Sequence, residues 1–122
     1  MRYMLLIYAN EQNWAKLPDA ERQQIVGEYM QLTQQLKSSG HWLAGGPLHP
    51  TSTAKSVRVR DARPVVTDGP FAETREQLGG YYLVEAKSED EALGIARRIP
   101  GARYGSIEVR QILEIPVQAT AS

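Results

Sequence analysis

The chain has 122 residues, a common length for a single domain. With 42% hydrophobic and 23% charged residues, its composition is that of a globular protein and excludes a disordered chain. Fourteen basic residues balance fourteen acidic ones, so the chain lacks the basic excess that nucleic-acid-binding proteins usually carry. It has no cysteine, which excludes disulfide bonds, zinc thiolate sites and a cysteine nucleophile.

The N-terminal apolar run, Met4–Ala9, predicts a central strand that is buried on both faces. The run is too short to span a membrane, and it lacks the cationic start and small-residue cleavage site of a signal peptide. We therefore expect a cytoplasmic protein with no membrane partner. The polar stretch Asn10–Leu17 is expected to be a surface connection.

A long amphipathic helix is predicted from Pro18 to Gly40. Proline and acidic residues suit its first turn, and Gly40 can end it in the left-handed conformation. The apolar stripe of this helix consists of Ile25, Tyr29, Leu32 and Leu36, widened by Val26 and Met30.

Short strands are predicted in the middle of the chain. They are His41–Ala44, which a Gly45-Gly46-Pro47 turn would end, Ser56–Arg60 paired as a hairpin with Val65–Thr67, and Tyr81–Ala86. Val57 and Val59 would share one face of the hairpin and leave the other face wet. Asp68–Gly80 is expected to be a loop.

A capping box, Ser88 to Glu91, predicts the start of a second helix that Pro100-Gly101 would end. The buried stripe of this helix would be Ala92, Ile95, Ala96 and Ile99. A last strand is expected over Ile107–Ile115, and residues 117–122 are expected to form a flexible tail after a single domain over residues 1–116.

Without the hairpin, the order of these elements is βαββαβ, which predicts an α+β ferredoxin-like fold with an inserted β-hairpin. The helices of such a fold lie on one face of the sheet, yet the strands carry apolar residues on both faces. We therefore expect a homodimer in which the sheets of two copies pack together.

Most cofactor and catalytic motifs are missing. No G-x-G-x-x-G, P-loop or G-x-S-x-G motif is present, so neither a cofactor nor a serine nucleophile is expected. His41 and His49 have no third nitrogen ligand and no helical spacing, so a metal site is not expected either.

The segment Asp68-Gly69-Pro70-Phe71 is the strongest candidate for chemistry. Its rigid turn can hold the Asp68 carboxylate at a strand end, as a general base or ligand anchor requires. The same carboxylate can instead simply cap the turn. Phe71 would pin the loop to the core, and Pro70 could start a short helix that carries Glu73 and Arg75.

The sequence resembles the YCII-related family, and within it the branch named for the Asp-Gly-Pro-Phe segment. The resemblance rests on blocks spread from residue 3 to residue 110: Tyr3–Tyr8, Gly46-Pro47-Leu48, Asp68–Phe71, Glu73, Glu76, Leu78–Tyr81 and Gly105–Arg110. It implies a ferredoxin-like domain that dimerises.

For function, the resemblance has two different implications. Some YCII-related proteins are enzymes that act on chlorinated aromatic diols through a histidine–aspartate pair, but Tyr29 stands where the histidine would be expected. Members of the Asp-Gly-Pro-Phe branch are often encoded near extracytoplasmic-function sigma factors, which implies a non-enzymatic accessory or regulatory module.

We therefore expect a small-molecule site near the Asp68 loop and the dimer interface, and whether the protein is an enzyme stays open. Asp68 is the candidate catalytic residue, and the candidate ligand-binding residues are Tyr29, Phe71, Glu73, Arg75 and Tyr81. The alternative for Tyr29 is a core tyrosine with a satisfied hydroxyl.

Overall fold

The computed structural model describes residues 1–116. The strands are β1 (Arg2–Ala9), β2 (Trp42–Pro47), β3 (Lys55–Arg60), β4 (Arg63–Asp68), β5 (Gln77–Glu85) and β6 (Ser106–Gln111). The α-helices are α1 (Glu11–Lys16), α2 (Asp19–Ser39) and α3 (Glu89–Arg98), and two short 3₁₀ turns cover Thr51–Thr53 and Pro100–Arg103. In this part of the chain no helix is long and apolar enough to cross a membrane.

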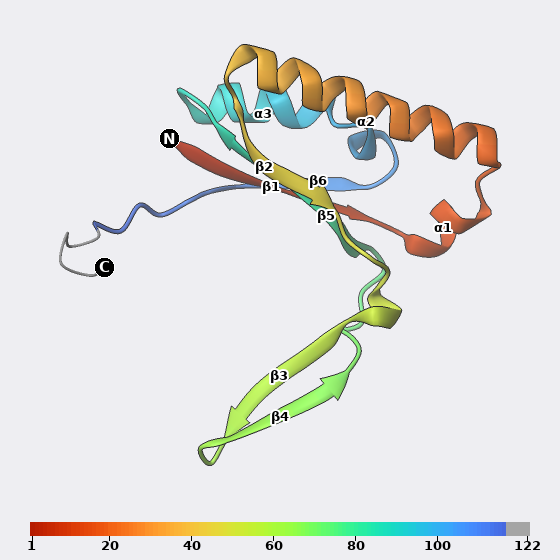
Figure 1. Cartoon of the computed structure of the whole chain (residues 1–122), viewed down its shortest axis with the longest axis vertical. Helices are drawn as coiled ribbons and strands as arrows, with labels where there is room; N and C mark the ends of the chain where they lie inside the picture. Colours follow the sequence, from red (N-terminus) through yellow and green to blue (C-terminus); the bar gives the residue numbers. More distant parts are fainter. Residues whose placement is uncertain (117–122) are drawn as a thin grey trace.

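The main sheet has the strand order β2-β5-β1-β6, and every neighbouring pair is antiparallel. Helix α2 connects β1 to β2, and α3 connects β5 to β6. This arrangement confirms the ferredoxin-like α+β fold. Figure 1 shows α2 and α3 together on one side of the sheet, while the β3–β4 hairpin extends away from it.

The core lies between the sheet and the two long helices. Alternate residues of β1, namely Tyr3, Leu5 and Ile7, are at most 8% exposed and face the helices. Tyr82 and Val84 of β5 extend this buried layer.

The other face of the sheet is uncovered in the single chain. Met4, Leu6 and Tyr8 of β1 point to it and stay half-exposed, so the prediction that β1 is buried on both faces is wrong for one copy. In register beside them lie Tyr81, opposite Leu6, and Leu83, opposite Met4. Across β6 on the same face, Arg110 lies opposite Met4 and Glu108 opposite Leu6, so the uncovered face is apolar over β1 and β5 and charged over β6, with no partner in the described chain.

Helix α2 packs through the predicted stripe but not through its predicted extension. Ile25, Leu32 and Leu36 are buried, whereas Val26 and Met30 are 46% and 66% exposed. These two residues lie too far round the helix to reach the sheet. Gly40 ends the helix with φ at 82°, as expected from its freedom in the left-handed region.

Strand β2 continues through Gly45-Gly46-Pro47, so the predicted turn there is wrong. A Cβ on Gly45 would lie 2.7 Å from both the Tyr81 carbonyl oxygen and the Trp42 ring. Glycine therefore serves close packing here, not a change of chain direction.

Other boundaries also differ from the sequence expectations. Residues 11–16 form α1, capped by the Asn10 side chain, and β5 begins at Gln77 inside the predicted loop. Strand β6 ends at Gln111, which leaves Leu113 and Ile115 81% and 71% exposed outside the sheet. Helix α3 buries Ala92, Ile95 and Ala96 as predicted. The predicted tail, 117–122, lies outside the described residues.

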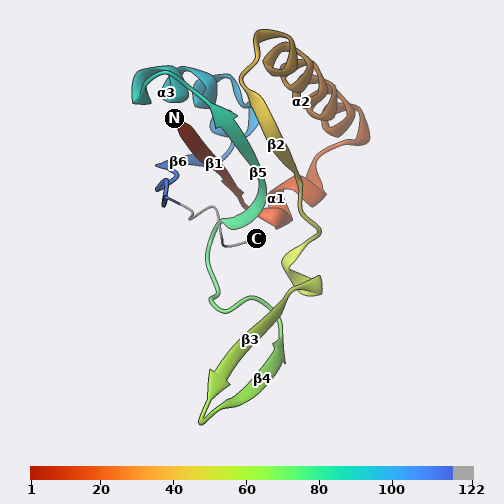
Figure 2. The same cartoon turned by 60° about the vertical axis from the view of Figure 1, so that its left-hand side comes forward.

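The β3–β4 hairpin forms at the predicted place, but it packs on nothing in the described chain. Its register pairs Val57 with Val66 and Val59 with Pro64 on one face. The three valines are 60–64% exposed, although one dry face was expected. Figure 2 shows the hairpin extended from the body in a second view.

Candidate functional site

Asp68 lies at the end of β4, where it pairs with Lys55 of β3 through an ion pair. Its side chain is 86% exposed. Both backbone groups of Gly69 hold the turn that follows: Gly69 N donates to Ala54 O at 2.7 Å, and the Ser56 hydroxyl donates to Gly69 O at 2.8 Å. In a single chain, the Asp68 carboxylate is neither enclosed in a cavity nor held by backbone amides.

The segment after Asp68 is exposed and has no regular structure. Phe71 is 82% exposed, so the prediction that it pins the loop to the core is wrong. Glu73 and Arg75 are exposed as well, and the predicted short helix that would carry them does not form. Gly69, before Pro70, has φ at 94°, in the left-handed region that glycine adopts readily.

The two tyrosines of β5 point to opposite faces, as predicted. Tyr82 is 4% exposed and packs edge-on against Trp42, with ring centroids 4.9 Å apart. Burial raises the pKa of Tyr82. Tyr81 is half-exposed on the uncovered sheet face, where a ligand or a second copy can reach it.

Tyr29 lies on the helix side of the sheet, away from Tyr81. Its hydroxyl oxygen accepts a hydrogen bond from Gly101 N at 3.0 Å, and burial raises its pKa. Its ring meets that of Tyr82 edge-on at 6.4 Å. This is the environment of a core tyrosine with a satisfied hydroxyl, and within one chain Tyr29 does not join the other candidate residues.

Sequence reasoning missed a polar network at the end of the sheet, beside the Asp68 loop. The Glu11 carboxylate accepts from Thr51 N and Thr51 Oγ1, both at 2.8 Å. Glu11 N donates to the Gln77 side chain at 3.0 Å, and Ser106 Oγ donates to Glu76 at 3.1 Å. These bonds anchor α1, the 3₁₀ turn at Thr51 and the last loop residues to one end of the sheet.

A second missed cluster lies at the C-terminal end of α2. Ser39 Oγ is 2.7 Å from His41 Nδ1, and His41 Nε2 is 2.9 Å from Glu91 Oε1 of α3. Hydrogen bonds from Lys87 N and then His41 lower the pKa of Glu91. The only sequence signal was the capping box, because Glu91 is its last residue.

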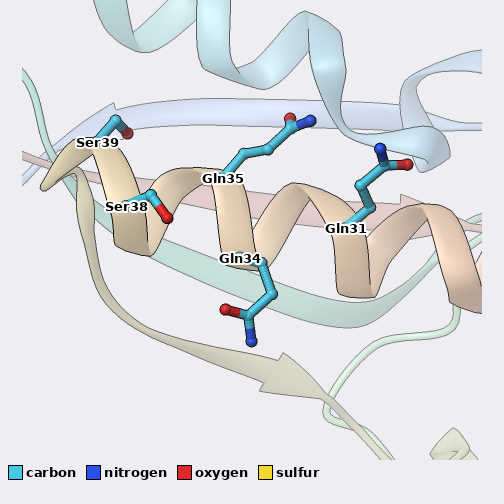
Figure 3. Close-up of a pocket in the computed structure, with 5 residues that line it drawn as sticks. All are labelled: Gln31, Gln34, Gln35, Ser38 and Ser39. Carbon is cyan, nitrogen blue, oxygen red and sulfur yellow. The ribbon is translucent and has the colours of Figure 1, made fainter.

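Neither of two open cavities on the described chain includes the Asp68 loop. A groove of about 550 Å³ runs along α2, lined by Gln31, Gln34, Gln35, Ser38 and Ser39 (Figure 3). A smaller one, of about 280 Å³, is lined by Met1 and residues 111–114. Within residues 1–116, no group of three histidine, aspartate or glutamate side chains is placed to hold a metal ion.

Comparison with known proteins identifies the family. The model of the YCII-related domain matches residues 1–116. The chain belongs to the YCII-related family. It is also 34% identical over 114 residues to the uncharacterised protein R00369 from Rhizobium meliloti (strain 1021), covering 92% of each chain. Its place in the Asp-Gly-Pro-Phe branch stays a prediction.

A solved structure has a similar fold. It is 5-chloro-2-hydroxyhydroquinone dehydrochlorinase (TftG) from Burkholderia phenoliruptrix AC1100, in complex with 2,5-dihydroxybenzoquinone. The match has a TM-score of 0.54 and covers 93% of this chain and 94% of TftG. At 14% identity, the likeness shows a shared fold alone.

Proposed function

We propose that this YCII-related protein forms a homodimer through its uncovered sheet face and binds a small hydroxylated aromatic molecule between the two copies, beside the Asp68 loop. The observation that carries the proposal is the apolar face formed by Met4, Leu6, Tyr8, Tyr81 and Leu83. Five such residues on one face of a sheet favour burial against another surface.

The β3–β4 hairpin is a reason to expect that the surface covering the sheet face belongs to a second copy of this chain. An isolated two-stranded hairpin is marginally stable in water, and this one exposes Val57, Val59 and Val66. In a two-fold dimer, the sheet face and the apolar hairpin face of one copy can each pack against the sheet or the hairpin of the other copy. In the proposed dimer the hairpin acts as an arm that embraces the other copy.

If a second copy completes the site, this explains why the Asp68 loop forms no enclosed site in a single chain. Asp68 and Phe71 are exposed, and their loop lines neither of the two cavities described above. In the proposed dimer, Tyr81 supplies an aromatic face and a hydroxyl, while Asp68 accepts a ligand hydroxyl with Glu73 and Arg75 nearby on the same loop. Burial against the partner would give the Asp68 carboxylate the desolvated surroundings that a general base needs.

The ligand class rests on the family and on TftG, whose complex contains 2,5-dihydroxybenzoquinone. A planar ring with hydroxyl and carbonyl oxygens suits tyrosine hydroxyls, a carboxylate and an arginine. Since Tyr29 replaces the expected helix histidine, the proposal transfers binding of such a ring and leaves the histidine-dependent chemistry aside.

The test combines mass in solution with ligand titration. We expect the wild type to be a dimer that binds 2,5-dihydroxybenzoquinone, and Leu83→Glu to be a folded monomer that binds it at least about tenfold more weakly. Leu113→Glu is the matched control, because Leu113 is 81% exposed outside the sheet. Asp68→Asn should keep the dimer and weaken binding.

Two results would redirect the proposal. A monomeric wild type would overturn the shared site. A dimer that binds neither this quinone nor hydroxyquinol would favour the non-enzymatic accessory module, in which the Asp68 loop only orders the interface.

A further inference from the structure

Ser39, His41 and Glu91 form a hydrogen-bonded chain on the helix side of the molecule, apart from the proposed dimer site. The three residues come from the end of α2, the position just before β2 and the first turn of α3. The distance from Ser39 Oγ to His41 Nδ1 is 2.7 Å, and that from His41 Nε2 to Glu91 Oε1 is 2.9 Å. A hydroxyl, an imidazole and a carboxylate in this order are the parts of an activated serine nucleophile.

The backbone fixes the imidazole in this position. Gly40, with φ at 82°, turns the chain back over the end of α2. His41 N then donates to Leu36 O at 2.9 Å, and Glu85 N donates to His41 O at 2.8 Å. With both backbone groups bonded, the ring is held above the helix end, next to Ser39.

The contacts also determine which His41 nitrogen carries a hydrogen and which one accepts the Ser39 hydroxyl proton. An ionised carboxylate can only accept, so His41 Nε2 carries the hydrogen that points to Glu91. His41 Nδ1 is then an acceptor, and the Ser39 hydroxyl donates to it. Ser39 Oγ has one other acceptor, Leu36 O, at the longer distance of 3.2 Å.

Two features stabilise the imidazolium that forms when His41 takes the serine proton. The Glu91 carboxylate contacts its ring, and hydrogen bonds from Lys87 N and His41 keep that carboxylate ionised by lowering its pKa. His41 also follows the C-terminal end of α2, where the helix dipole favours a positive charge.

The nucleophile is accessible from solvent. Ser39 is exposed and lines the open groove of about 550 Å³ on α2. Figure 3 shows Gln31 and Gln35 reaching from the helix toward α3. Arg98 Nη2 donates to Gln35 Oε1 at 2.8 Å, which places a guanidinium on that side of the groove. Neutral carboxamides and a neighbouring cation suit the carbonyl oxygen of an uncharged ester.

The geometry points to Ser39 as a nucleophile that accepts an acyl group from small uncharged carboxylic esters. Ser39 Oγ attacks the carbonyl carbon and its proton passes to His41 Nδ1. The alkoxide leaves with that proton, which gives acyl-Ser39 and an alcohol. Water then attacks the acyl carbon, loses a proton to His41, and releases the acid as Ser39 recovers its proton. His41 and Ser39 are the catalytic residues, and Glu91 is a positioning residue.

The test uses p-nitrophenyl acetate on the full chain, with release of p-nitrophenolate followed in time and the acetylated residue found by peptide mapping. We expect acetyl-Ser39 in the wild type and in Ser38→Ala, the matched control from the same groove. Ser39→Ala should lose this adduct. His41→Gln should slow acetylation of Ser39 by roughly 10²-fold, the usual contribution of a general base.

Glu91 is tested by two substitutions whose folding is checked by thermal melting. Gln can still accept from His41 Nε2, so Glu91→Gln should retain more of the acetylation rate than Glu91→Ala. Equal rates in both variants and the wild type would remove Glu91 from the mechanism.

Acetyl groups on lysines or the amino terminus, with none on Ser39, would overturn the proposal. Equal labelling of Ser38 and Ser39 would do so as well, because it would indicate exposure without activation. Mapping of the wild-type chain decides these points even where a variant fails to fold.

Discussion

Tyr29 shows how one side chain can occupy a candidate site position and yet serve the core. Its hydroxyl accepts from Gly101 N, beside a backbone so close that a Cβ on Gly101 would lie 2.7 Å from that oxygen. The Gly101 N–H therefore depends on this tyrosine for its hydrogen bond.

Tyr29→Phe should lower the free energy of unfolding by about 1–3 kcal/mol, because a buried donor loses its acceptor. Urea unfolding measures the change, and Tyr104→Phe is the control, since Tyr104 is 57% exposed. An unchanged stability in Tyr29→Phe would mean that the Gly101 N–H has another partner.

Asp68 and Phe71 show that the residue types of a motif do not by themselves predict which groups its side chains contact in the fold. The sequence predicts a turn at Asp68–Pro70, and the chain does bend at Gly69, but the Asp68 side chain pairs with Lys55, thirteen residues earlier, through the hairpin register. Ser39, His41 and Glu91 were missed for a related reason, because a contact between residues fifty positions apart leaves no local pattern. Only the folded chain brings such groups together.

At the scale of the element, helices were predicted best because their signals are local. The stripes and caps of α2 and α3 lie within a few turns, and both helices form within two residues of the predicted bounds. Leu78-Gly79-Gly80 looked like loop, yet it opens β5. A Cβ on Gly80 would lie 3.1 Å from the Gly46 carbonyl oxygen, a closeness that depends on pairing with the distant strand β2.

Substitution by alanine should change the free energy of unfolding in opposite directions at Gly27 and Gly40, the glycines inside and at the end of α2. Gly27 lies inside the helix with no atom within 4 Å of a new Cβ, so Gly27→Ala should stabilise the protein by about 0.5–1 kcal/mol. Gly40 has φ at 82°, so Gly40→Ala should destabilise it by about 1 kcal/mol or more. Urea unfolding of both variants checks the signs, and stabilisation by Gly40→Ala would contradict the left-handed cap.

The contact between α2 and α3 predicts a dependence of stability on pH. Hydrogen bonds from Lys87 N and His41 lower the pKa of Glu91 below its ordinary value of 4.5. Stability from this carboxylate is therefore complete above pH 4.5 and is lost as the pH falls through the lowered pKa.

Urea unfolding at about pH 6 and about pH 3 measures this effect. The wild type should lose more stability over that interval than Glu91→Gln, which has no carboxylate to titrate. The same loss in both proteins would show that Glu91 is not held by these bonds in solution.

At the scale of the whole molecule, two apolar surfaces have no partner in the described chain: the face of the main sheet and one face of the hairpin. A monomer would leave both in water, whereas a dimer can bury each at about 25 cal/mol per Å² of apolar area. Both surfaces belong to the same chain, which favours a two-fold assembly of identical copies.

The hairpin gives a matched pair for testing this assembly. Val66 shares the apolar face with Val57, while the neighbouring Val65 points to the opposite face beside Arg58. Val66→Lys should weaken the dimer at least about tenfold, since a lysine would be buried in the interface. Val65→Lys should have little effect. Sedimentation across a concentration series measures both, and equal dimer constants would exclude the hairpin from the interface.

The most direct test of the central claim is sedimentation velocity of the wild-type chain at micromolar concentration, with Leu83→Glu run beside it. We predict a wild-type species of twice the 13.6 kDa chain mass, and a folded Leu83→Glu of one chain mass. A folded wild type that stays at one chain mass at every concentration would contradict the shared site.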